Sequence, residues 1–290
     1  MTTYEKTIKF LTPFLAAKSI NPSSGKPFFL GIEGPQGSGK TTLSRTLAKE
    51  IPRLYPKLKV IAFSMDDFYL TYEKQNKLAN QNPDNILLSG RFLGTHDLDL
   101  LNKCMTRLSK ENDGVDIPVY DKSKHDGKGD RLPFMNWTHI VGPVDVVIFE
   151  GWFNGYRSYK ESSDVLKQWK VLKFQHPIAC EGISDNNIVR LNQDLAEYEC
   201  IWKFFDAFVG ITTDNIENVY KWRLQQEHDL IKSAGSGMTD KEVHRFVDRY
   251  MAGYWLFYGS LGLTMKQFPS INVCIDEKRN VIRCSSRSHL

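Results

Sequence analysis

The stretch GPQGSGKTT, residues 34–42, decides the fold of this chain. It matches the pattern G-x-x-x-x-G-K-[ST], with Gly34, Gly39, Lys40 and Thr41 at the fixed positions. An apolar run, FFLGIE (28–33), precedes it, and a helical pattern, TLSRTLAKEI (42–51), follows it. The stretch therefore lies between a strand and a helix, which is the context in which a loop of this kind binds phosphate.

The chemistry of such a loop explains its residue types. Successive backbone N–H groups and the positive end of a helix surround a polyphosphate, and glycines let the backbone approach it closely. The Lys40 ammonium can reach the β and γ phosphates, and the Thr41 hydroxyl can bind Mg²⁺. We therefore expect ATP and Mg²⁺ as cofactors. The predicted nucleotide-binding residues are Gly34, Pro35, Gln36, Gly37, Ser38, Gly39, Lys40, Thr41 and Thr42.

Short apolar runs alternate with longer helical patterns along the chain. Strands are expected at PFFLGIE (27–33), LKVIAFS (58–64), VDVVIFE (144–150), DAFVGIT (206–212) and INVCID (271–276). Helices are expected at 1–20, 40–51, 97–110, 187–205, 214–233 and 239–258. Near-continuous apolar runs are typical of parallel strands that are covered on both faces. We predict an α/β fold of the P-loop NTPase type, with helices on both faces of a parallel sheet.

The segment 72–143 differs from the rest of the chain. It is polar and rich in Gly, Asn, Asp and Lys, so we expect loops and a helix, inserted at the carboxyl ends of the strands. Ligands of α/β sheets bind at that end. The chain is predicted to form a single domain, 1–290, with 1–20 as a leading helix and 72–143 as the substrate side.

Two acidic positions follow predicted strands. Glu150 ends VDVVIFE, at the place where proteins with this loop carry the acid on the metal side, although an Asp is more usual there. Asp66 and Asp67 follow KVIAFS, and a kinase needs a base near the γ-phosphate to take the proton of an alcohol. Asp66 is the predicted base, while Asp67 points to the other side and orients the turn. The alternative for the pair is a solvated turn.

Composition excludes several classes of protein. The 290 residues carry a net charge of only +4, with basic and acidic residues interspersed, which requires neither a nucleic acid nor a membrane as partner. Five scattered cysteines without a CxxC pair argue against a disulfide framework or a zinc site. No run approaches the length that spans a bilayer. We expect a cytoplasmic location, a small-molecule substrate and no protein partner.

The motifs resemble one family of kinases. GPQGSGKTT, then S-x-D-x-F-Y as SMDDFY (64–69), then a strand closing in FEG (149–151), are similar to the phosphoribulokinase, uridine kinase and bacterial pantothenate kinase group. GTHDL (94–98), IPVYDKS (117–123), GKGDR (127–131), WRLQQE (222–227) and GMTDKEVHRFVDRYM (237–251) resemble its glycerate kinases, as found in plants. The resemblance implies an ATP-dependent kinase for a small alcohol, with Asp66 as catalytic base and Glu150 beside Mg²⁺.

Further residues are candidates for contact with the substrate. Arg91 can pair with the carboxylate of a small acid, or lie on the surface as an ordinary charge. His96 can bond a substrate hydroxyl or serve in the structure, and Asp97 is also a plausible helix cap. The resemblance implies substrate contacts from Tyr120, Asp121, Lys122 and Arg131, and Tyr69 is added as a candidate.

One arginine outside the insertion is a candidate for catalysis. Arg223 resembles the lid arginine of the group, which would stabilise the transferring phosphoryl group, and its alternative is an ion pair with Glu227. No role is assigned to Lys128, Arg245 or Arg249.

D-glycerate is the first candidate substrate. Alternatives inside the enzyme class are uridine and pantothenate, and Tyr69, Phe92 and Tyr120 leave open a slot for a stacked base. The alternative outside it is a regulatory protein that binds ATP without phosphoryl transfer. A GTPase would need N-K-x-D, which the sequence does not contain.

Overall fold

A six-stranded sheet forms the centre of the protein. The computed structural model describes residues 1–22, 25–110, 114–235 and 237–288. The strands stand in the order β10-β9-β8-β1-β7-β2, and all neighbours are parallel except β10 and β9. Their bounds are β1 Phe28–Glu33, β2 Val60–Ser64, β7 Val146–Gly151, β8 Ala207–Thr213, β9 Ser270–Ile275 and β10 Val281–Arg287.

The predicted α/β fold with a mainly parallel sheet is confirmed. All five expected strands are present, and β7 is buried at every position, as its continuous apolar run requires. The antiparallel edge strand β10 was not predicted. Its sequence, VIRCSSR, is mostly polar and exposed, so it carries no buried strand pattern.

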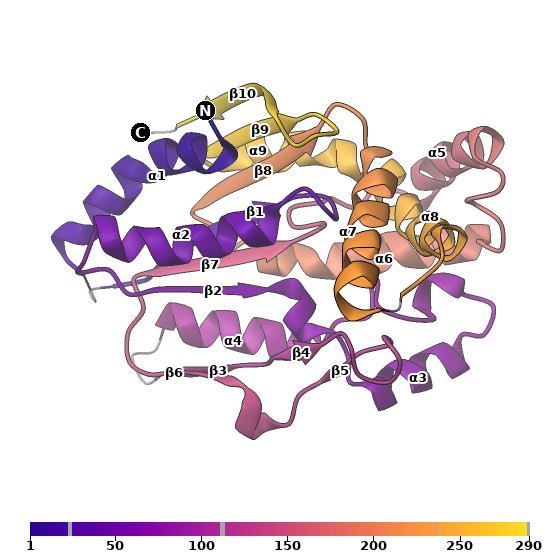
Figure 1. Cartoon of the computed structure of the whole chain (residues 1–290), viewed down its shortest axis with the longest axis horizontal. Coiled ribbons are helices and arrows are strands. Elements are labelled where there is room, and N and C mark those ends of the chain that lie inside the picture. Colours follow the sequence, from indigo (N-terminus) through magenta and orange to yellow (C-terminus); the bar gives the residue numbers. More distant parts are fainter. Residues whose placement is uncertain (23–24, 111–113, 236, 289–290) are drawn as a thin grey trace.

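Helices cover both faces of this sheet. Within the described residues they are α1 Thr3–Ile20, α2 Lys40–Leu54, α3 Tyr72–Gln81, α4 Leu98–Lys110, α5 Ser162–Gln175, α6 Asp185–Trp202, α7 Asn218–Ala234, α8 Asp240–Phe257 and α9 Leu261–Gln267. Helices α1 and α2 lie together on one face, and α9 packs on β8 and β9 from the other (Figure 1). The six expected helices are confirmed with shifted ends, whereas α3, α5 and α9 were not predicted. Helices α3 and α5 bury few side chains, so their patterns are weak.

No helix in the described ranges has the length and apolar character that crossing a membrane requires.

The register of the parallel strands places three carboxyl ends side by side. Strand β7 lies between β1 and β2, and Glu150 pairs with Ile32 on one side and Ser64 on the other. The phosphate loop follows β1, and Asp66 follows β2. Since parallel strands end at the same edge of a sheet, this order brings the loop, Glu150 and Asp66 to one place.

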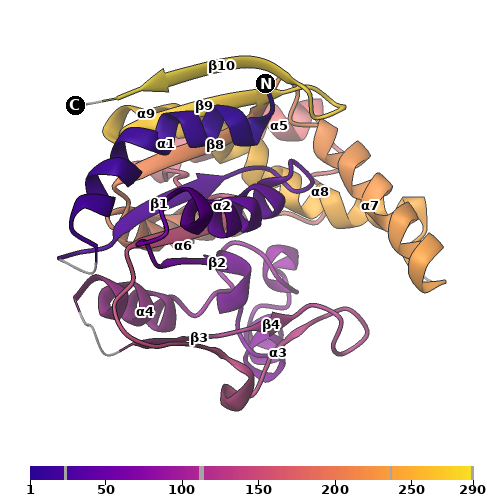
Figure 2. The ribbon, with the colours of Figure 1, turned by 60° about the vertical axis from the view of Figure 1, so that its left-hand side comes forward.

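The segment 72–143 lies along the β2 side of the sheet (Figure 2). It is more regular than the loops and one helix expected, because it contains α3, α4 and two small antiparallel pairs. Strand β3 (Val115–Ile117) pairs with β6 (Thr138–Ile140), and β4 (Tyr120–Asp121) pairs with β5 (Asp130–Arg131). Strand β4 contacts the 3₁₀ turn Met65–Phe68 that follows β2. The insertion therefore delivers Tyr120–Lys122 to Asp66.

Candidate active site

The phosphate loop is held in shape by contacts from distant parts of the chain. Gly37 and Gly39 have φ angles of +84° and +93°, which glycine adopts without strain. The amide of Gln36 donates to the Tyr254 hydroxyl over 3.0 Å. The Arg279 guanidinium donates to the carbonyl of Gly37 over 2.7 Å. Helix α2 starts directly after Gly39, so its positive end faces the same space.

Thr41 and Glu150 meet at the rim of this loop. The Thr41 hydroxyl donates to Oε1 of Glu150 over 2.8 Å. The other carboxylate oxygen, Oε2, is buried and has no hydrogen-bond partner. A buried carboxylate oxygen without a partner is costly, and a cation would satisfy it. The pair therefore fits Mg²⁺, which favours oxygen ligands. No cluster of three or more His, Cys, Asp or Glu side chains that could hold a metal occurs in the described part of the chain, so phosphate oxygens and water would complete the shell.

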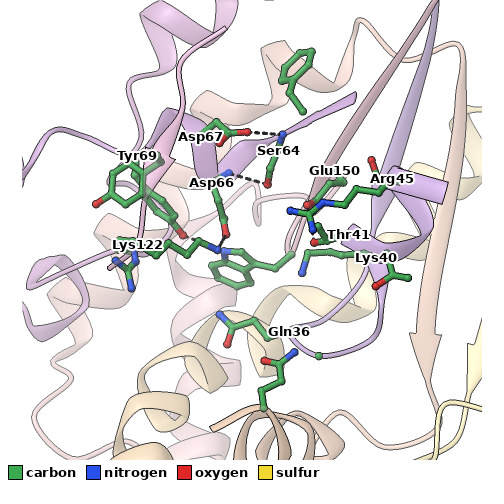
Figure 3. A pocket seen from close by; sticks show the side chains of 18 of the residues that line it. Gln36, Lys40, Thr41, Arg45, Ser64, Asp66, Asp67, Tyr69, Lys122 and Glu150 are labelled. Carbon is green, nitrogen blue, oxygen red and sulfur yellow. Dashed lines mark hydrogen bonds and ion pairs between the residues drawn. The ribbon is translucent and has the colours of Figure 1, made fainter. Parts of the chain in front are cut away.

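The turn after β2 separates the roles of the two aspartates (Figure 3). The amide of Ser64 donates to Oδ2 of Asp67 over 3.0 Å, and the amide of Asp66 donates to the Ser64 hydroxyl over 3.2 Å. Asp67 is thereby fixed in the cap of the 3₁₀ turn, and burial raises its pKa to about 6. Asp66 instead points into the cavity, where its Oδ2 lies 2.5 Å from the Lys122 ammonium.

Cations surround Asp66. Burial by itself would raise the pKa of this carboxyl, but the charges of Lys122 and Lys40 outweigh it and hold the pKa at about 2. The charge of Asp66 in turn raises the pKa of Lys122. Asp66 is therefore ionised and paired throughout the neutral pH range.

A cavity of about 920 Å³ connects the phosphate loop with Asp66 and β4. Five cations line it: Lys40, Arg45, Arg91, Lys122 and Arg223. The carboxylates are Asp66, Asp67, Asp121 and Glu150. The aromatic side chains are Phe63, Tyr69, Tyr120, Trp152, Phe246 and Tyr250. A cavity with this many cations favours ligands with several negative charges.

Most of the residues expected at the site reach this cavity. From the insertion and the turn before it come Asp66, Tyr69, Arg91, Tyr120, Asp121 and Lys122. Arg223 lines the cavity as well, and its guanidinium also lies 2.7 Å from Oε2 of Glu227 and over the ring of Phe246. The predicted ion pair of Arg223 is thus compatible with a place on the cavity wall, and its role as a lid residue stays a prediction.

Three expected substrate residues lie behind the cavity wall instead. The His96 ring stacks on Tyr69 with centroids 4.0 Å apart, and its Nδ1 lies 2.7 Å from the Tyr198 hydroxyl. Arg131 donates to Oδ2 of Asp97 over 3.1 Å and to the carbonyl of Tyr69 over 2.9 Å. His96, Asp97 and Arg131 do not line this cavity and instead support its wall, and their contact with substrate stays a prediction.

Burial explains the state of that supporting layer. The Arg131 side chain is 8 % exposed, and its hydrogen bond to the carbonyl of Tyr69 holds the chain at that residue. Burial lowers the pKa of His96 to about 3, so its ring is neutral and stacks as an aromatic group. His96 and Arg131 thereby fix the orientation of Tyr69, whose side chain lines the cavity.

Sequence patterns missed several lining residues. Arg45 lies four positions after Thr41 on α2, so the helical period alone places it on the same face. Trp152 and Tyr250 come from distant segments and pack edge to face, with centroids 5.2 Å apart. No local signal marks these two, because aromatic residues at such positions are more often core.

A second cavity, of about 770 Å³, lies on the other side of the phosphate loop. It shares Gly37, Gly39 and Thr42 with the first cavity. The first residues of α1 and the turn between β9 and β10 form its walls. A ligand whose phosphates lie on the loop can therefore extend in both directions from it.

Comparisons with known proteins agree with this arrangement. A model of the Phosphoribulokinase / Uridine kinase family matches residues 29–170. The "Probable ATP-dependent kinase TDA10" of Saccharomyces cerevisiae is 37% identical over 304 residues, covering 99% of this chain and 97% of that protein. The chloroplastic D-glycerate 3-kinase of Arabidopsis thaliana is 35% identical, over 88% of this chain and 54% of its own length. A solved D-glycerate 3-kinase from Cryptococcus neoformans superposes with a TM-score of 0.84 at 32% identity, covering 99% of this chain and all of that one.

Proposed function

Since the chain belongs to the phosphoribulokinase and uridine kinase family and is a small-molecule kinase, we propose that its acceptor is D-glycerate. The resemblance expected from the motifs is confirmed by this membership, and ATP is the phosphoryl donor of such a kinase. The observation that carries the choice of acceptor is the position of Arg91 and Lys122, two cations at the acceptor end of the cavity. The two D-glycerate 3-kinases among the relatives support the same choice.

In this proposal ATP lies across the phosphate loop. The nucleoside occupies the second cavity, and the γ-phosphate enters the first. Thr41 and Glu150 would hold Mg²⁺, which neutralises charge on the phosphates when it is bound. Lys40, Arg45 and Arg223 line this cavity and would stabilise the charge of the transferring group.

The acceptor hydroxyl lies between Asp66 and the γ-phosphate. Its proton passes to the Asp66 carboxylate, its oxygen forms a bond to the γ-phosphorus, and the bond to the bridging oxygen of ADP breaks. The carboxylate of the acceptor lies between Arg91 and Lys122. Trp152 and Tyr250 are each 2 % exposed and close the wall behind, which helps to exclude water.

A nucleoside acceptor is less well supported. A base would need a free aromatic face, but one face of Tyr69 is covered by His96. Phe92 is fully buried, and Tyr120 meets Tyr69 edge to face with centroids 5.6 Å apart. The three aromatic residues that left this option open therefore do not form a stacking slot.

The test is a coupled ADP-release assay on the purified protein with Mg·ATP. Acceptors are D-glycerate, uridine, pantothenate and ribulose 5-phosphate, and Lys40→Ala serves as the blank. Stimulation by D-glycerate alone would support the proposal, and stimulation by another acceptor would refute it. ATP binding without stimulation by any of these acceptors would favour the regulatory alternative.

A further inference from the structure

The ion pair between Asp66 and Lys122 raises a chemical problem. Asp66 Oδ2 lies 2.5 Å from the Lys122 ammonium, so the two groups form a close, charge-assisted hydrogen bond. A general base needs a free oxygen to receive the proton of the acceptor. With Lys122 in this place, Asp66 is engaged by a cation and is a weak base.

The two partners differ in mobility. The Lys122 side chain is 58 % exposed, whereas the Asp66 side chain is 23 % exposed and its turn is capped by Ser64 and Asp67. The backbone beside Lys122 is fixed, because Asp121 pairs with Asp130 and accepts from the Ser123 amide over 2.9 Å. The ammonium can therefore leave Asp66 by side-chain rotation alone, without any change in the hairpin.

A second cation, Arg91, lines the same cavity close enough to Lys122 for the two charges to repel. The Arg91 guanidinium donates to the carbonyl of Lys128 over 2.7 Å and lies over the Tyr120 ring, so the same hairpin holds it in place. Arg91 and Lys122 repel each other, and Asp66 offsets that repulsion in the protein without acceptor. A carboxylate between the two cations would replace Asp66 in this role.

We propose that Lys122 blocks the catalytic base Asp66 by pairing with it, and that the carboxylate of the acceptor releases this block. We call this ion pair the lock. The ammonium turns from Asp66 to the acceptor's carboxylate, which leaves Asp66 free to receive the proton from a hydroxyl of the same molecule. This inference rests on the proposed function, since it needs an acidic acceptor. It goes further in that the negative charge of the acceptor is required for activation of the base as well as for binding, so a neutral polyol of the same size leaves the lock closed.

The first test measures whether Asp66 and the acceptor compete for Lys122. D-glycerate binding is measured by calorimetry, with a non-hydrolysable ATP analogue present, for wild type, Asp66→Asn, Lys122→Gln and the double variant. We expect Asp66→Asn to bind D-glycerate several-fold more tightly than wild type. In this variant the Lys122 ammonium has no carboxylate partner at position 66, so it is available to the carboxylate of D-glycerate. In the Lys122→Gln background the same change should have no such effect.

Two outcomes of this test would overturn the lock. Binding to Asp66→Asn that is unchanged or weaker shows that there is no competition. Tighter binding that persists in the Lys122→Gln background shows a general effect of the lost negative charge.

The second test measures selectivity as kcat/KM for D-glycerate against glycerol. Lys122→Gln should lower the value for D-glycerate and raise the value for glycerol, since Asp66 is then free without a carboxylate. The ratio of the two should fall at least about 10-fold. Lys124→Gln is the matched control, because it removes a lysine of the same hairpin that does not line the cavity.

The outcomes separate this inference from the proposed function. If wild type does not phosphorylate D-glycerate, the proposed function fails. If wild type does so, while Lys122→Gln weakens D-glycerate and leaves glycerol unchanged, Lys122 only binds the acceptor and the lock alone is refuted.

Discussion

Gly37 and Gly39 offer a test of how the phosphate loop is packed. Both have positive φ angles, +84° and +93°, so alanine at either position carries the strain of the left-handed region, about 1–2 kcal/mol. They differ in their surroundings. A Cβ on Gly37 would lie 2.4 Å from the Cβ of Trp222, whereas nothing lies within 4 Å of a Cβ on Gly39.

Trp222 cannot move aside easily. It is 1 % exposed, and its indole N–H donates to the carbonyl of Glu277 over 2.6 Å. Arg279, which itself binds the carbonyl of Gly37, lies over its ring. Overpacking a fixed neighbour costs about 1–3 kcal/mol in addition to the strain. We therefore expect losses of about 1–2 kcal/mol for Gly39→Ala and about 2–5 kcal/mol for Gly37→Ala.

The assay is urea unfolding without nucleotide, because a Cβ on Gly39 would also face the phosphates. An unchanged m-value would show that the two variants unfold between the same states. Gly127→Ala, at φ +82° and with nothing within 4 Å, gives the cost of strain alone at a distant turn. The motif G-x-x-x-x-G-K-[ST] fixes Gly39 and leaves position 37 free, so the motif suggests the reverse order. An equal or larger loss for Gly39→Ala would refute the packing argument.

Three further results are expected. Lys40→Ala should abolish ADP release in the coupled assay, because the phosphates lose their main cation. Asp66→Asn should lower kcat by roughly 10²–10⁴ with ATP affinity by calorimetry near wild type, and full activity would contradict the assignment of the base. Burial raises the pKa of Asp194 from its ordinary value of 3.8 to about 6 in the folded protein. The unfolded chain therefore loses this proton at lower pH than the folded protein, and the free energy of unfolding falls as pH rises between these two values. The free energy of unfolding of wild type relative to Asp194→Asn, measured by urea, should fall by roughly 3 kcal/mol between pH 3.5 and pH 7, and a pH-independent difference would contradict the raised pKa.

The sequence could predict features that depend on neighbours along the chain. The phosphate loop, Lys40 and Thr41 lie in one motif, and their strand and helix have strong local patterns. Glu150 lies at the end of β7 and Asp66 follows the end of β2, and the rule that parallel strands end at one edge was sufficient to bring them together.

Features that depend on how distant segments pack could not be predicted in this way. His96, Asp97 and Arg131 have the residue types of a binding site, but the insertion turns them into the layer behind Tyr69. Trp152 and Tyr250 have the residue types of a core and yet line the cavity.

The sequence by itself thus determined the class of fold, the phosphate loop and the two acids at the strand ends, because short-range geometry and the sheet edge specify them. Only the tertiary structure decided which cations of the insertion face the cavity beside Asp66. The β4–β5 hairpin carries both Lys122 and Arg131, and its packing on the turn after β2 sends Lys122 to Asp66 and Arg131 to Asp97. That choice depends on contacts between segments far apart in the chain, and no pattern within either segment contains it.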